Sequence, residues 1–146
     1  MRNGHVYTSP TEENAVTKGS NGNLTNYTRV RYDSDGQVKD KSVYIHEYYQ
    51  NESGVKGHSI NGTIYDKDGR ITKTDVATVE YDSDGNKTTS HVETNFDGNG
   101  NVTSKKTTVS KYDSTGKPVK ETVTEEDANG NRIASTSIYY DNNGNV

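Results

Sequence analysis

"YDSDG" is the sequence of residues 32–36 and again, letter for letter, of residues 81–85. Near-copies are found at 65–69 (YDKDG), 96–100 (FDGNG), 112–116 (YDSTG) and 140–144 (YDNNG). An Asp that opens a four-residue turn binds backbone N–H groups through its side chain. The Gly that closes it adopts the left-handed conformation required by a type I turn followed by a G1 bulge. The motif therefore predicts a hairpin turn, repeated along the chain.

The closing glycines recur at intervals of 14 to 18 residues, with a mean near 15.6, over essentially the whole chain. They are Gly4, Gly22, Gly36, Gly54, Gly69, Gly85, Gly100, Gly116, Gly130 and Gly144. The segments between them contain many Thr, Val and Tyr residues, which favour strands; examples are 70–81, 101–112, 118–127 and 132–140. None of these four has an interior Gly, and Pro118 stands at a strand start, where proline is tolerated. We expect about nine strands in one repeat domain that spans residues 1–146.

Two topologies fit one strand per turn. In a parallel solenoid the turn aspartates would stack about 4.8 Å apart, which costs about 0.9 kcal/mol per pair even at the dielectric constant of water. In an antiparallel meander, successive turns at one edge lie about 9.6 Å apart, beyond the Debye length of about 8 Å. The uneven intervals also suit hairpins better than solenoid coils. We therefore predict an all-β fold, a repetitive antiparallel β-meander.

The strand faces predict how many layers the fold has. Over residues 71–81 neither alternate set of side chains is apolar enough to line the dry core of a sandwich. Such a sheet would be stabilised by cross-strand pairs of Thr, Tyr, Val and Lys–Glu. A largely single-layer sheet is the first prediction, and an up-and-down barrel is the alternative.

Composition fits an ordered β protein with a thin core. Leu, Ile, Val and Phe together supply 22 of the 146 residues, about 15%, and a share below roughly 20% indicates disorder when net charge is also high. The net charge here is only −4, and nineteen Thr, fourteen Val and eleven Tyr favour strands. Disorder is the alternative interpretation of the low apolar content.

Several classes of protein are excluded by composition. There is no Cys, hence no disulfide framework and no thiolate chemistry. The first ten residues, MRNGHVYTSP, lack the apolar region of a signal peptide, and no apolar run approaches the ~20 residues of a membrane helix. Lysines scattered among acidic residues argue against nucleic-acid binding. We therefore expect that the protein neither binds nucleic acid nor inserts into a membrane.

The stretch NGTIYDKDGRIT at residues 61–72 resembles the YD repeat of Rhs-type toxin shells and teneurins, in which the pattern is Tyr-Asp-x-x-Gly-Arg-Leu-Thr. Here Ile71 replaces the Leu. Asn replaces the Arg in other copies, at Asn86, Asn101, Asn131 and Asn145. The resemblance implies β-hairpin strips in a bacterial surface or secreted setting. It transfers no catalytic residue.

The acidic turns are the candidate metal ligands. Asp33, Asp35, Asp66, Asp68, Asp82 and Asp84 resemble calcium-loop ligands, but an EF-hand also needs a Glu six residues after the Gly. Asp75 is the one acidic residue among the six such positions inspected, and His91 is another of them. Turn capping is the favoured role for these carboxylates.

No catalytic chemistry is predicted. His5, His46, His58 and His91 have no metal-ligand spacing, and no serine stands in a nucleophile motif. Paired carboxylates such as Glu125 and Glu126 fit a solvated charge cluster at a strand end. The sequence predicts a non-enzymatic protein without a cofactor.

The last repeat is among the cleanest and carries no atypical cap. This predicts head-to-tail strand addition between copies, and hence a self-assembling extracellular or cell-surface fibre of bacterial type. One alternative is a carbohydrate-binding or adhesive module that stacks sugars on exposed tyrosines. The other is a fragment of a YD-repeat toxin shell. The predicted partners are other copies of the chain, with glycans under the first alternative.

Overall fold

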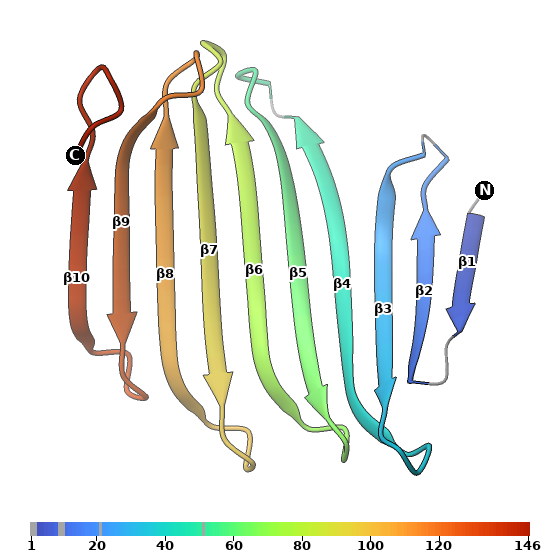
Figure 1. Ribbon diagram of the computed structural model, residues 1–146. Helices are drawn as coiled ribbons and strands as arrows, with labels where there is room; N and C mark the ends of the chain where they lie inside the picture. Colours follow the sequence, from blue (N-terminus) through green and yellow to red (C-terminus); the bar gives the residue numbers. More distant parts are fainter. Residues whose placement is uncertain (1–2, 9–10, 21, 51) are drawn as a thin grey trace.

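One open antiparallel sheet contains every strand of the computed structural model, which describes residues 3–8, 11–20, 22–50 and 52–146, with side chains from residue 11 onward (Figure 1). Ten strands are described. They are β1 (Asn3–Thr8), β2 (Glu12–Lys18), β3 (Leu24–Tyr32), β4 (Val38–Gln50), β5 (Lys56–Asp66), β6 (Ile71–Tyr81), β7 (Lys87–Phe96), β8 (Val102–Tyr112), β9 (Pro118–Glu126) and β10 (Arg132–Tyr139).

The strand order in the sheet is the order in the sequence. Each strand pairs antiparallel with its sequence neighbours, while β1 and β10 form the two outer edges. The predicted single-sheet meander is therefore confirmed, and the sheet does not close into the alternative up-and-down barrel. No helix in the described part of the chain has the length and apolarity needed to cross a membrane.

The two identical pentapeptides form the same turn. In the first, the N–H of Gly36 donates to the carbonyl of Asp33 at 3.1 Å, and one carboxylate oxygen of Asp33 accepts the N–H groups of Asp35 and Gln37 at 2.9 and 3.0 Å. The second repeats these three bonds at 3.1, 2.9 and 2.9 Å around Asp82. The two turns lie at opposite ends of the strands (Figure 1). Because their surroundings differ, the pentapeptide itself determines the turn.

Nine of the ten aligned glycines have a positive φ, between 78° and 87°, among the residues described. The tenth, Gly4, was aligned wrongly as a turn residue: it lies inside β1, opposite Thr17. Since β1 and β2 both precede Gly22, the described chain has ten strands where about nine were expected. Pro10, at the connection between these two strands, lies outside the described residues.

Register differs between hairpins. It shifts by one residue beside the turn in six hairpins, and in four of these the shift falls at the aromatic residue that precedes the turn Asp: Tyr32, Tyr65, Phe96 and Tyr112. Each of these four shifts leaves one extra residue on the later strand, as in a β-bulge. The extra residues are Lys39, Thr72, Thr103 and Val119, none of which has a positive φ, so these bulges are separate from the turn glycines. The β4–β5 and β6–β7 hairpins pair without a shift over their described residues. Thus the turn beginning at Asp33 is followed by a shifted register, and the identical turn beginning at Asp82 is not.

The sheet has no apolar core. No hydrophobic side chain is buried in the part of the chain described, and the most buried side chain is that of Ser42, 3% exposed. The register places Tyr44, Asp75 and Glu93 on one surface, which we call the groove face. Thr63, Thr74 and Thr94 form a row across the opposite face. Stability therefore comes from backbone hydrogen bonds and from cross-strand side-chain pairs, which contribute about 0.2–1 kcal/mol each.

The turns at one end of the strands contact each other. A methyl group placed on Gly54 would lie 3.5 Å from the Cβ of Ser83, and one on Gly85 would lie 3.6 Å from the Cβ of Ser114. The Lys117 ammonium donates to the carbonyl of Asn142 at 3.3 Å. These turns are the upper ones in Figure 1. The Gly54–Ser83 and Gly85–Ser114 contacts bring these turns closer than the roughly 9.6 Å expected for two strand spacings.

Candidate ligand-binding groove

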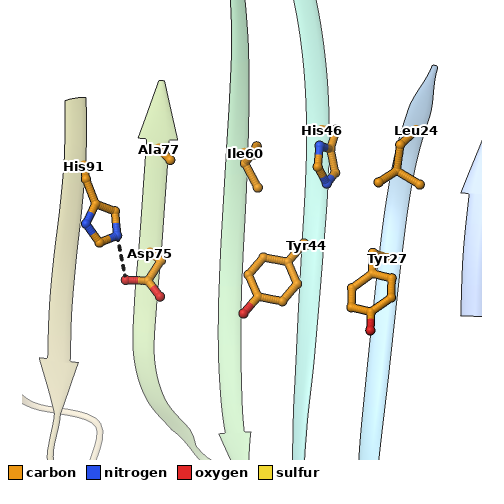
Figure 2. A pocket seen from close by; sticks show the side chains of 8 residues that line it. All are labelled: Leu24, Tyr27, Tyr44, His46, Ile60, Asp75, Ala77 and His91. Atoms are coloured by element: carbon orange, nitrogen blue, oxygen red, sulfur yellow. Dashed lines mark hydrogen bonds and ion pairs between the residues drawn. The ribbon is translucent and has the colours of Figure 1, made fainter. Parts of the chain in front are cut away.

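A shallow hollow of about 400 Å³ lies on the groove face, across strands β3 to β7 (Figure 2). It is lined by Leu24, Tyr27, Tyr44, His46, Ile60, Asp75, Ala77 and His91. The register explains the hollow: His46, Ile60, Ala77 and His91 form one row across four strands, so that the small Ala77 separates larger neighbours.

Tyrosines form one wall of the groove. Tyr44 lies directly opposite Gly62, and its ring rests over the glycine backbone, since a methyl group on Gly62 would lie only 2.7 Å from a ring carbon. The Tyr27 and Tyr44 rings are 6.1 Å apart between centroids and inclined at 37°. The Tyr27 hydroxyl donates to the side-chain oxygen of Asn14 at 2.5 Å. The wall therefore has aromatic carbon on its surface and a fixed orientation.

Asp75 and His91 form the polar wall of the groove, and Glu93 and Lys73 lie next to them. His91 Nε2 lies 3.2 Å from an oxygen of Asp75, the contact drawn in Figure 2. Glu93 is directly opposite Asp75 on the neighbouring strand. The Lys73 ammonium lies 3.7 Å from the Asp75 carboxylate and 3.4 Å from that of Glu93. The groove thus combines an aromatic wall with a charged one.

Two histidines contact each other at the groove: His46, which lines it, and His58 on the neighbouring strand. His46 Nδ1 is 3.0 Å from His58 Nε2, and the His58 ring stacks on Tyr48 with centroids 4.1 Å apart and planes inclined at 11°. Burial lowers the pKa of His46, and the neighbouring His58 lowers it further. We therefore expect His46 to be neutral near pH 7.

The six predicted calcium candidates are not brought together. Asp33, Asp66 and Asp82 each open a different turn, and one carboxylate oxygen of each accepts two backbone N–H groups. The side-chain amide and the backbone N–H of Asn86 hold the pKa of Asp82 below its usual range. Asp35, Asp68 and Asp84 each donate a backbone N–H to the Asp two residues earlier. The favoured capping role is thus observed at these turns, and calcium binding there stays a prediction.

Asp75, His91 and Glu93 form a group of possible metal ligands that no spacing in the sequence indicated. Their ligand atoms all lie within 4.8 Å of one another, although sixteen residues separate the first two in the sequence. The available signal was their placement on either side of the turn at Asp82. That turn limits the partner of Asp75 to Glu93 or Thr94, depending on whether the register shifts.

Comparison with known proteins gives no relative. No protein-family model, no curated protein and no solved structure matches the chain. The groove and the edges of the sheet must therefore be interpreted from their own chemistry.

Proposed function

We propose that this protein is a structural, non-enzymatic β-repeat protein that assembles with copies of itself, by edge-strand addition, into a fibre. The observation that carries the proposal is the uncharged run of residues 133–139 in the edge strand β10, in a sheet whose described residues include no buried hydrophobic side chain. An open strand edge offers unpaired N–H and C=O groups to another chain.

Natural sheets usually protect their edges with charged residues, proline or a covering element. Residues 133–139 of β10, IASTSIY, contain no charge, no proline and no glycine. Ile133 and Tyr139 are 65% and 63% exposed. Segments of high β-propensity and low charge are those that pair with other chains. The sequence of β1, NGHVYT, also has no Lys, Arg, Asp or Glu.

The number of described strands suits such pairing. Ten alternating strands make β1 and β10 run in opposite directions (Figure 1). A second copy, translated across the sheet without inversion, would therefore place its β1 antiparallel to β10 of the first. The meander would then continue from copy to copy with the same alternation.

The proposed setting is extracellular or at a bacterial cell surface. This part of the proposal is supported by the resemblance of residues 61–72 to YD repeats. It includes neither a nucleic-acid partner nor insertion into a membrane.

Electron microscopy and analytical ultracentrifugation of the purified chain test the assembly. We expect the wild type to form filaments at high concentration and Ser137→Lys to abolish them, because a charge in β10 would be placed at the junction. Ser34→Lys is the matched control, since Ser34 is exposed in a turn away from both edge strands. A wild type that stays monomeric at high concentration, or filaments that survive Ser137→Lys, would contradict the proposal.

A carbohydrate-binding or adhesive role is the second candidate, and the groove favours it. Aromatic rings stack against the apolar faces of sugars, while Asp75 and His91 can bind their hydroxyl groups. A glycan array probes this role, with Tyr44→Ala expected to lose any binding. Tyr81→Ala is the control, because Tyr81 is exposed but does not line the groove. An array without a hit, or equal binding by both variants, would remove this candidate.

A further inference from the structure

The charged wall of the groove contains an unfavourable pair. Asp75 and Glu93 are direct cross-strand neighbours on β6 and β7, and like charges placed directly opposite destabilise a sheet. Their carboxylates converge on the Lys73 ammonium, at 3.7 and 3.4 Å. The fold thus places two carboxylates around one position that a cation already occupies.

An imidazole completes the group. His91 lies two residues before Glu93 on the same face, and its Nε2 is 3.2 Å from the Asp75 carboxylate. The three ligand atoms lie within 4.8 Å of one another, so that a modest movement of side chains would place all three around one ion. The site is accessible, because the side chains of Asp75, Glu93 and His91 are 21%, 31% and 48% exposed.

The donor set indicates the class of ion. Imidazole suits zinc, copper, iron and nickel, whereas calcium and magnesium prefer oxygen ligands alone. Three protein ligands with a further position left for water or substrate are typical of accessible zinc sites. We propose that Asp75, His91 and Glu93 bind a first-row divalent transition metal of the zinc class, at the charged wall of the groove.

Lysines set the affinity of this site. Lys73 must leave the two carboxylates before the metal binds, and this exchange is feasible because partly exposed ion pairs are weak. Lys106, opposite Glu93 on β8, stays as a second positive charge, and Glu125 lies opposite Lys106 on β9. Removing the Lys73 charge should therefore strengthen metal binding, whereas a purely structural role of the three ligands gives no such effect.

Isothermal titration of the metal-free chain with ZnCl₂ tests the site. We expect one zinc per chain, at least tenfold weaker binding in His91→Asn and in Glu93→Gln, and several-fold tighter binding in Lys73→Met. Calcium chloride should bind more weakly at this site than zinc. Circular dichroism of each variant checks that the sheet is intact.

His58→Asn is the matched control, because the pair formed by His46 and His58 is a rival site with two nitrogens 3.0 Å apart. Zinc binding that is unchanged in His58→Asn and lost in His91→Asn supports the proposal. The reverse pattern assigns zinc to the rival pair and overturns it. The proposal is also overturned if zinc does not bind, or if Lys73→Met binds it no more tightly than the wild type.

Discussion

Replacing Gly100 by Ala tests the conformation of the repeated turn. Gly100 closes the turn between β7 and β8 with φ at +83°, and a methyl group placed on it would contact nothing within 4 Å. The substitution therefore creates no clash, and its cost is that of the left-handed backbone alone. That cost is roughly 1–2 kcal/mol for a residue with a Cβ atom.

Gly98, in the same turn, supplies a matched control. It lies outside the left-handed region and likewise has open space around it. Gly98→Ala should stabilise the protein by about 0.4–1 kcal/mol, because alanine restricts the unfolded chain. The two variants have the same composition, and the effect on the unfolded chain cancels between them, so that their difference, about 1–2 kcal/mol, isolates the backbone conformation.

Urea and thermal unfolding measure this difference. For a chain of this size it corresponds to about 2–8 °C in Tm. Both substitutions belong in the Ser137→Lys background, since assembly would otherwise contribute to apparent stability. If Gly100→Ala is no less stable than Gly98→Ala, the assignment of a left-handed residue at the end of each turn is refuted.

Three further predictions concern titration and charge. Hydrogen bonds from neighbouring side chains and backbone N–H groups lower the pKa of five turn aspartates, Asp82, Asp97, Asp113, Asp127 and Asp141. The stability that these aspartates contribute should be complete above their unfolded pKa of about 3.9 and should be lost as the pH falls below that value. A urea midpoint that is as high at pH 2.5 as at pH 6 would contradict this expectation. The Tyr49 hydroxyl donates to Glu80, which raises the pKa of Tyr49 to about 12, so Glu80→Gln should return it toward 10, as followed by NMR titration against Tyr49→Phe. Arg31 holds the pKa of Asp40 below its usual range through a two-bond contact, and Asp40→Asn should cost about 0.2–1 kcal/mol in urea unfolding at low salt and less at high salt.

Local features of this fold could be predicted because the turn chemistry lies within five residues. The pentapeptide at 32–36 and its copy at 81–85 make the same hydrogen bonds at opposite ends of the strands. The strands expected over 70–81 and 101–112 are observed as Ile71–Tyr81 and Val102–Tyr112. Gly4 was misassigned from its spacing alone, since it lacks the Asp or Asn three residues earlier that most of the other copies have.

The candidate site could not be predicted, because it depends on register. After the first YDSDG turn the pairing shifts by one residue, and after the second it does not. A shift at the second turn would have placed Thr94, not Glu93, opposite Asp75, and a slip of one residue moves side chains to the other face. Nothing within the two identical pentapeptides distinguishes these outcomes. The groove has the same origin, since Tyr44 covers Gly62 only in the unshifted register of β4 and β5.

The contacting turns at the upper end of the strands indicate how such a chain can lengthen. Gly54, Gly85 and Gly116 follow one another at intervals of 31 residues, which is two strands and two turns. Duplicating or deleting one strand would reverse the direction of everything after it and transfer every later turn to the other end of the sheet. Duplicating two strands preserves both the direction of the later strands and the end of the sheet at which each later turn lies. The unit of duplication in this architecture is therefore a pair of strands with its two turns, and variants of different length should differ by an even number of strands, about 31 residues for each pair.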